Sequence, residues 1–548
     1  MSNQTDSRRF GLAFLSGLAL GASYPVLGLY WMAWVVPGLL LLLGAGQRGS
    51  AVFRIGFYAG LGNFLCSLYW FLLIPMRVKG AAAWVLLSIC LALFYGAWCW
   101  VCWRGFPATA PPPRAKGSAP RVINPLLAVS WRQRVAWAAF CGIAWAAMEL
   151  TIARFLSGFP WNLLGASQYR LLPLIQIASV TGVQGISFMV VWVSTALSCA
   201  VWMAWRAQPA WTALARELAV PFLALAGAIL FGCVKLSRPE PASAHLKVAL
   251  VQPAIPQSII WDLNERTNRL HKLLELSHAA LAQRPDLLVW PEAALPPTMV
   301  GRTRETQELI TALVRSNGVW MVFGGIDTAR RRDGDGEPFQ FNAAFLIDPA
   351  GDLVARYYNR HLVMFGEYMP AIRWLPFLRY FRQGGGGMEA GRHPASFQMQ
   401  QPRARISPLI CFEDVFPAET RVSVDADTDF LLNLTNNGWF GESAAQWQHA
   451  MCALFRAVEN GLPLVRCTNN GLTCWIDANG RIHDAYFPGS LNIYQAGYKI
   501  VTIPLRPAGP SQPLTIYHRF GDWFGWTCVL LMVARAAWTF ASARRTGS

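Results

Sequence analysis

The chain has 548 residues, of which 54% are hydrophobic and only 14% are charged, and its formal net charge is +17. This length is too great for one compact core, and so apolar a composition excludes an ordinary soluble protein. A membrane component is therefore expected, and the 25 Trp residues fit it because Trp favours the membrane interface. No nucleic-acid partner is expected, because no Lys/Arg-rich run stands beside aromatic residues.

Eight apolar segments are expected to form membrane helices, seven before residue 238 and one near the C-terminus. They cover residues 10–25, 26–44, 52–75, 81–103, 135–156, 174–204, 217–235 and 523–541. Most reach the length of about 20 residues that a helix needs to cross a bilayer. We expect residues 1–238 to form a transmembrane bundle, and residues 511–548 to hold the last helix and a tail.

Basic residues gather at alternate ends of these segments. Arg48, Arg104 and Arg206 belong to the basic set of ends, whereas the opposite ends carry few charges, such as Arg77 and Lys79. The positive-inside rule places the basic ends in the cytoplasm. Both termini are then expected to be cytoplasmic, with residues 239–510 on the outer side of the membrane.

Residues 239–510 combine short apolar strands with amphipathic helical stretches. The expected strands are 247–252, 287–290, 319–324, 343–347, 405–411, 430–434 and 464–467, and the expected helices include 263–282 and 303–316. Such alternation indicates a layered α/β domain whose sheet is covered on both faces. Residues 348–351 and 477–480 are typical of hairpin turns.

Only four of the twelve cysteines belong to this polar domain, and no CxxC pair has partners that suggest zinc. Cys411 ends the strand-like run 406–411 and is followed by Glu413. A thiol where a strand stops has a fixed backbone and a projecting side chain, so Cys411 is a candidate nucleophile. The alternative is a small buried packing residue.

Carboxylates follow two other strand-like runs. Glu292 comes just after residues 287–290, and Glu367 ends the polar stretch 358–367. A carboxylate near a cysteine can take the thiol proton and create the thiolate that acyl transfer requires. Asn342 precedes an apolar strand and is expected only to end a turn, while His449 is an isolated histidine with an expected packing role.

Several short motifs follow one another along the chain. They are Gly158-Phe-Pro-Trp161, Trp290-Pro-Glu292, His361-Leu-Val, Ile410-Cys-Phe-Glu413 and Asn433-Leu-Thr-Asn-Asn-Gly. Their order and spacing resemble the apolipoprotein N-acyltransferases over nearly the whole length. That family consists of membrane enzymes with a nitrilase-like (carbon–nitrogen hydrolase) domain. The resemblance implies about eight transmembrane helices and an extracytoplasmic αββα sandwich.

The resemblance also implies a catalytic triad of Glu292 as general base, Cys411 as nucleophile, and a lysine two residues before the His of the HLV motif. This chain has Asn359 at that position. An amide can donate a hydrogen bond to an oxyanion but carries no charge, and losing an oxyanion donor costs on the order of 3 kcal/mol. Arg360 should point to the opposite face of a strand, so His361 is the neighbour expected to share a face with Asn359.

Three explanations of Asn359 remain: a slowed enzyme, an enzyme with a relocated cation, and a degenerate copy. Supporting roles are implied for Glu367, Glu413, Tyr368 and Trp261. The glycine run 384–387 is a candidate lid over the site. Asn437 stands where the family often has Asp.

The implied reaction takes an acyl chain from a membrane phospholipid through a Cys411 thioester to the α-amino group of a diacylglyceryl-cysteine apolipoprotein. It needs no cofactor and no metal, because the thiol carries the acyl group. The implied location is the bacterial inner membrane, with the catalytic domain in the periplasm. Because Asn359 replaces the lysine, the alternative is a non-catalytic protein that acts in binding or assembly. A membrane-bound amidase is disfavoured, because soluble nitrilase-like enzymes do not need eight membrane segments.

Overall fold

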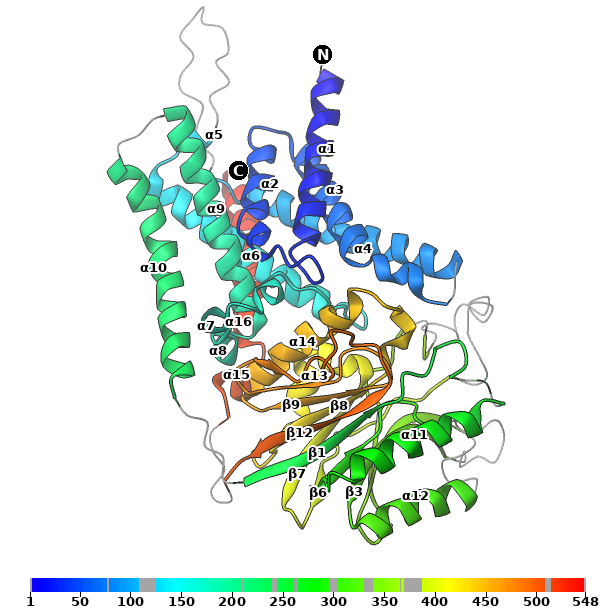
Figure 1. Ribbon diagram of the computed structural model, residues 1–548. Coiled ribbons are helices and arrows are strands. Elements are labelled where there is room, and N and C mark those ends of the chain that lie inside the picture. Colours follow the sequence, from blue (N-terminus) through cyan, green and yellow to red (C-terminus); the bar gives the residue numbers. More distant parts are fainter. Residues whose placement is uncertain are drawn as a thin grey trace, which may run out of the picture. The chain divides into compact units, whose positions relative to one another are not determined.

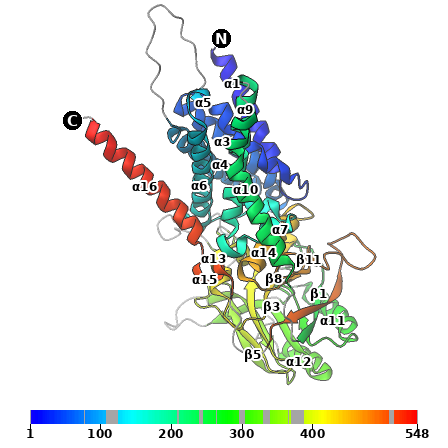
Figure 2. The same cartoon turned by 90° about the vertical axis from the view of Figure 1, so that its left-hand side faces the viewer.

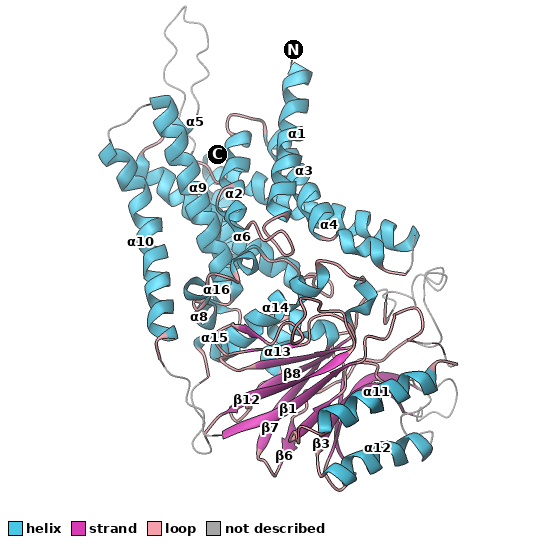
Figure 3. Cartoon of the chain, viewed as in Figure 1, coloured by secondary structure: helices cyan, strands magenta, loops and turns pink. Residues whose placement is uncertain are grey.

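The computed structural model describes residues 2–75, 78–107, 125–207, 211–238, 244–260, 262, 264–295, 304–329, 339–364, 366–368, 387–507 and 514–546. The chain divides into two compact units, residues 1–238 with 520–548, and residues 239–519. In the described part, the first unit is helical and every strand belongs to the second (Figure 3).

The long helices of the first unit are α1 (Ser2–Gly21), α3 (Gly49–Ser67), α4 (Val78–Arg104), α6 (Trp131–Arg154), α9 (Val183–Ala207), α10 (Trp211–Leu236) and α16 (Trp523–Thr546). Shorter helices between them are η1 (Tyr30–Trp34), α2 (Val36–Gly44), η2 (Tyr69–Leu73), α5 (Pro125–Ala128), η3 (Leu164–Gln168), α7 (Leu172–Ile175) and α8 (Ala178–Thr181). Figure 2 shows them from the side.

Within the described residues, five of these helices are long and apolar enough to cross a membrane, namely α4, α6, α9, α10 and α16. The expected segment 174–204 is divided, because Gly182 ends α8 with a φ of 69°, and only its second part forms α9. Residues 26–44 likewise divide into η1 and the nine-residue α2.

Small residues set how closely these helices pack. A Cβ atom on Gly56 of α3 would lie 2.4 Å from the backbone oxygen of Tyr95 on α4. A Cβ atom on Gly60 would lie 2.8 Å from the Cα atom of Ala92. Only glycine permits this approach, which is the usual way membrane helices gain contact area.

The second unit contains two six-stranded sheets (Figure 1). The first has the order β12-β1-β2-β3-β4-β5, with β1 (Ala244–Gln252), β2 (Leu287–Val289), β3 (Trp320–Ala329), β4 (Phe339–Ile347), β5 (Leu353–Tyr358) and β12 (Gly497–Leu505). The second has the order β11-β10-β9-β8-β7-β6, with β6 (Phe397–Met399), β7 (Ala404–Ile410), β8 (Phe430–Thr435), β9 (Leu464–Thr468), β10 (Cys474–Ile476) and β11 (Ile482–His483).

Apolar side chains of both sheets meet in one core, which includes Leu250 and Val289 from the first sheet and Ile410 and Leu434 from the second. Helices α11 (Arg266–Leu281) and α12 (Arg304–Asn317) lie beside each other on the outer face of the first sheet (Figures 1 and 2). Helices α13 (Pro417–Val422) and α14 (Ala445–Asn460) belong to the second sheet's side, and α15 (Ile516–Phe520) follows β12. The unit is an αββα sandwich, as expected.

Candidate active site

The site lies where parallel strands of both sheets end. Strands β7, β8 and β9 run parallel, with Ile410 opposite Leu434 and Thr435 opposite Thr468. Strand β2 runs parallel to β1 and β3 in the other sheet. Residues that follow the carboxyl ends of parallel strands meet at one edge of a sheet, where ligands commonly bind.

Cys411 follows β7 directly and opens the short helix η5 (Cys411–Val415). Its φ is 48°, in the left-handed region, where a side chain costs roughly 1–2 kcal/mol. The Asn433 amide of β8 donates a 3.0 Å hydrogen bond to the Cys411 carbonyl and holds this conformation. The residue as a whole is partly exposed.

Glu292, the first carboxylate of the site, follows β2 and is 9% exposed. It accepts hydrogen bonds from the Asn342 amide at 2.8 Å and from the Asn436 backbone N–H at 2.7 Å. It is also hydrogen-bonded to the Cys411 thiol. Burial raises the pKa of Glu292 and, together with the charge of Glu292, raises the pKa of Cys411 well above its usual value. The resting pair is therefore a thiol facing a carboxylate.

Asn342 has a larger part in the site than the sequence indicated. It was expected to end a turn, but it lies inside β4, is buried, and points its amide at two carboxylates. The amide donates to Glu292 at 2.8 Å and to Glu367 at 3.3 Å. No local pattern reveals this, because the three residues meet only through the tertiary fold.

Asn359 comes directly after β5 and is 2% exposed. Its backbone N–H donates to the Asn342 carbonyl at 2.8 Å, and its side-chain amide reaches the Glu367 carboxylate at 3.5 Å. The lysine position of the family is thus beside Glu367 and Asn342. A separation of 3.5 Å is the limit of a hydrogen bond, so the amide is held loosely.

The expected alternation of faces at Arg360 and His361 is wrong, because β5 ends at Tyr358 and these residues are not in a strand. The Arg360 guanidinium binds the α13 region instead, with hydrogen bonds to the Glu419 carbonyl at 2.9 Å and the Ser423 hydroxyl at 2.8 Å. The His361 ring packs on Phe416, with ring centroids 3.7 Å apart. In the described part of the chain, neither Glu292 nor Glu367 forms an ion pair with Lys or Arg.

Glu413 ties the nucleophile turn to neighbouring backbone. Its carboxylate accepts 2.7 Å hydrogen bonds from the N–H groups of Ile410 and Arg360 and from the Tyr357 hydroxyl. Burial raises the pKa of Glu413 to about 7 despite these bonds. The carboxylate thus fixes the residue before Cys411 and the residue after Asn359.

The remaining predicted residues lie at or beyond the edge of the described site. The backbone N–H of Tyr368 approaches the Val363 carbonyl at 3.5 Å. Trp261 and the glycines 384–386 of the candidate lid lie outside the described residues. Their roles stay predictions.

Glu367 should make stability depend on pH. The residue is partly exposed, but its carboxylate is turned inward toward Asn342, Asn359 and the Val363 N–H, which donates at 2.8 Å. Burial and the charge of Glu292 raise its pKa from 4.5 to about 7. In the unfolded chain Glu367 loses its proton at a lower pH than in the folded protein. Its contribution to the free energy of unfolding is therefore complete below pH 4.5 and is lost as pH rises through 7.

We therefore expect Glu367→Gln to flatten the pH dependence of unfolding between about pH 5 and 8, by at most about 3 kcal/mol in the free energy of unfolding. Thermal unfolding of the purified protein in detergent micelles, measured at several pH values, checks this. Glu389→Gln is the control, because Glu389 is an exposed carboxylate on the neighbouring strand-like segment. If the stability of wild type and of Glu367→Gln changed equally with pH, the Glu367 carboxylate would ionise in the folded protein as it does in the unfolded chain.

Known protein families match both units of the chain. Residues 16–196 match the apolipoprotein N-acyltransferase N-terminal domain, and residues 247–496 match the carbon-nitrogen hydrolase family. The apolipoprotein N-acyltransferase of Geobacter metallireducens is 33% identical over 541 residues, which cover 97% of this chain and 95% of that protein. This chain belongs to the apolipoprotein N-acyltransferase family.

Other members show the same full-length similarity. The apolipoprotein N-acyltransferases of Brucella melitensis and Rickettsia prowazekii are 31% and 29% identical, over 97% and 93% of this chain and 95% and 93% of their own. Among solved structures, an amidase from Nesterenkonia sp. AN1 matches 49% of this acyltransferase homologue and 94% of its own chain, with 18% identity and a TM-score of 0.35.

Proposed function

We propose that this protein transfers an acyl chain from a membrane phospholipid, through a thioester on Cys411, to the α-amino group of a diacylglyceryl-cysteine apolipoprotein. The observation that carries the proposal is the buried contact between Glu292 and the Cys411 thiol in a chain that belongs to this family over its whole length. A base in contact with a thiol is the pair that nucleophilic acyl transfer requires.

The first half-reaction forms the thioester. Glu292 accepts the thiol proton while the sulfur attacks the ester carbonyl carbon of the phospholipid. When the tetrahedral intermediate collapses, the C–O bond breaks and Glu292 returns the proton to the departing lysophospholipid oxygen. Glu292 thus acts first as base and then as acid, and its raised pKa suits both roles.

The second half-reaction forms the amide. The acceptor's amino nitrogen attacks the thioester carbonyl, Glu292 takes a proton from that nitrogen, and the C–S bond breaks. Glu292 then returns the proton to the sulfur, which restores the Cys411 thiol. The phospholipid and the diacylglyceryl acceptor are both lipids, so the proposal requires the site to be reached from the bilayer.

In place of the lysine's charge, we propose that neutral donors stabilise the oxyanion. The Asn359 amide is the first of these, because its 3.5 Å contact with Glu367 leaves it available. Glu367 is the second, since with a pKa of about 7 it is partly protonated at neutral pH and a carboxylic acid can donate a hydrogen bond. Arg360 cannot supply the charge while it is held at α13.

Asn359→Lys should raise the rate of thioester formation on the order of tenfold to a hundredfold, because a charged donor stabilises an oxyanion better than an amide. Mass spectrometry of the Cys411 peptide after incubation with phospholipid vesicles measures the rate. Asn359→Leu, which has a similar size and no donor, is the matched control and should be slower than wild type. A clean thiol in wild type with a labelled Asn359→Lys variant would favour a binding or assembly role for the natural protein.

We also propose that the protein spans the bacterial inner membrane about eight times, with both termini in the cytoplasm and the sandwich in the periplasm. A cysteine placed at the exposed Glu275 of α11 should then react with a membrane-impermeant maleimide in intact spheroplasts. A cysteine placed at Ser50, at the opposite membrane side, should react only after permeabilisation. The reverse pattern would overturn the orientation.

A further inference from the structure

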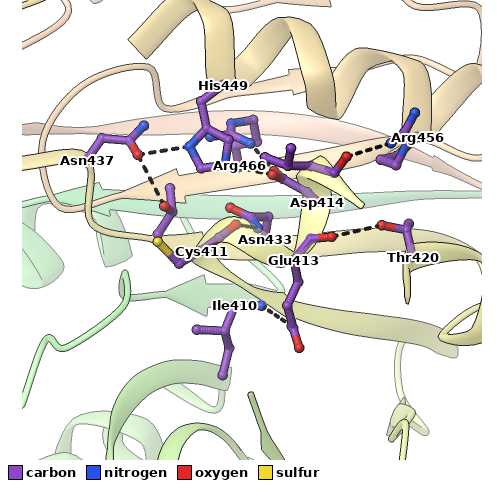
Figure 4. A network of polar contacts seen from close by, with 12 residues as sticks. Ile410, Cys411, Glu413, Asp414, Thr420, Asn433, Asn437, His449, Arg456 and Arg466 are labelled. Atoms are coloured by element: carbon purple, nitrogen blue, oxygen red, sulfur yellow. Dashed lines mark hydrogen bonds and ion pairs between the residues drawn. The ribbon is translucent and has the colours of Figure 1, made fainter. Parts of the chain in front are cut away.

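A buried polar network lies beside Cys411, on the helix side of the second sheet (Figure 4). Asp414, three residues after the nucleophile, forms an ion pair with Arg466 of β9 and a 2.7 Å contact with His449 Nε2 of α14. All three side chains are at most 1% exposed. Ionisable groups this deeply buried are costly unless they are paired, so their placement calls for a role.

The network continues from His449 back to the nucleophile. His449 Nδ1 lies 2.9 Å from the Asn437 side-chain amide, and the same amide atom lies 3.4 Å from the Thr435 hydroxyl. The Thr435 hydroxyl in turn interacts with the Cys411 thiol and lowers the thiol pKa. A chain of contacts therefore leads from Asp414 through His449, Asn437 and Thr435 to Cys411.

The direction of the hydrogen bonds depends on which end of the Asn437 amide faces His449. With its oxygen there, both imidazole nitrogens face oxygen acceptors, and the ring must carry a positive charge. In that orientation, Asn437 Nδ2 also has no hydrogen-bond partner among the described residues. Both features are unfavourable in a buried site.

The charges around His449 favour a neutral ring. The charged groups that face it are Asp414 of η5 and Arg466 of β9. Burial and Arg466 lower the His449 pKa more than Asp414 and the Cys411 backbone raise it. A neutral ring that donates from Nε2 to Asp414 has an unprotonated Nδ1, which can only accept a hydrogen bond. Turning the Asn437 amide by half a turn places Nδ2 there, so that both His449 Nδ1 and Asn437 Nδ2 are hydrogen-bonded, and moves the amide oxygen to the place that has no partner among the described residues.

With Nδ2 in that place, Asn437 donates one hydrogen to His449 and the other to the Thr435 oxygen. A hydroxyl has a single hydrogen, so Thr435 must then direct its own toward the Cys411 sulfur. We propose that His449 is a positioning residue that, through Asn437, fixes the Thr435 hydroxyl as a hydrogen-bond donor to the nucleophilic sulfur. The donor favours the thiolate against Glu292 and Glu367, the two carboxylates whose charges face Cys411.

This inference rests on Cys411 being the nucleophile of the proposed function, and alkylation tests it without any lipid substrate. The purified full-length protein in detergent micelles is treated with iodoacetamide across a range of pH, and the rate for the Cys411 peptide is measured by mass spectrometry. The peptide that contains the buried Cys467 serves as the internal control. Thr435→Val, which keeps the side-chain shape, should slow alkylation at neutral pH roughly tenfold and move its pH profile upward.

Three further variants separate positioning from packing. Thr435→Ser should restore the wild-type profile, since it restores the hydroxyl. His449→Phe should move the profile as Thr435→Val does, and the double variant should be no slower than Thr435→Val, because both changes remove the same donor. If His449→Phe does not fold, Asn437→Ala takes its place with the same expected results.

An unchanged pH profile in Thr435→Val would overturn the proposal, as would effects that multiply in the double variant. Failure of Thr435→Ser to restore the profile would assign Thr435 a packing role only, which also overturns it. These outcomes leave the acyl-transfer proposal untouched, because alkylation needs neither phospholipid nor lipoprotein. Conversely, if no acyl adduct formed on wild-type Cys411 after incubation with phospholipid vesicles, the proposed function would be overturned.

Discussion

Cys411→Ala should abolish both the acyl-enzyme and transfer to a diacylglyceryl peptide, a loss of more than about ten-thousandfold in rate, as when other covalent nucleophiles are removed. The reason is geometric: Cys411 directly follows the end of β7, and its thiol contacts Glu292. Mass spectrometry of the protein after incubation with phospholipid vesicles, followed by addition of a lipopeptide acceptor, measures both half-reactions.

Cys467→Ala is the matched control for this experiment. Cys467 lies in β9 of the same sheet, one residue before the strand ends, but its thiol is buried and donates weakly to the carbonyls of Val251 and Val289 at 3.4 and 3.5 Å. It should keep its acyl-transfer activity apart from a modest loss of stability. An acyl adduct that persists in Cys411→Ala would move the nucleophile elsewhere in the chain.

Glu292→Gln should slow thioester formation roughly a thousandfold, within the range for removal of a general base. Gln has nearly the same shape, but it cannot take the thiol proton. It also presents at most one acceptor to the N–H groups of Asn342 and Asn436, which now donate to two carboxylate oxygens. Single-turnover acylation measured at several pH values checks this. In wild type the acylation rate should rise as Glu292 ionises, and in the variant this rise should be absent.

Glu419→Gln is the control for that change. Glu419 is a partly exposed carboxylate paired with Arg360 at 3.3 Å, so the variant tests a lost negative charge away from the thiol. Its acylation rate should stay close to wild type. Equal losses in the two variants would mean that Glu292 acts through general electrostatics rather than as the base.

Much of the sandwich could be predicted from the sequence, because each strand is a short apolar run that ends in polar residues. The end of β7 identified Cys411, and the end of β2 identified Glu292. Strands β5, β6, β10, β11 and β12 were not among the expected strands. Edge strands such as β6 and β11 are only two or three residues long, too short for alternation to be recognised.

Asn359, Glu367 and Glu413 were named from the resemblance, whereas the other residues of the site are joined by contacts that sequence spacing does not encode. Asn342 and Glu292 are separated by 50 residues, and His449 and Asp414 by 35, so neither pair has a local signature. The predicted orientation of Arg360 was wrong for a different reason. The prediction extended a strand that stops at Tyr358, and the alternation of faces ends with the strand.

The left-handed backbone of Cys411 sets catalysis against stability at a single residue. Glycine would adopt a φ of 48° without a steric penalty, so the fold itself favours a residue that has no side chain there. Retaining the thiol means that the Asn433 and Glu413 hydrogen bonds hold the turn in a conformation that cysteine resists. Selection for stability alone would erase the nucleophile, and only selection for the reaction keeps it in place.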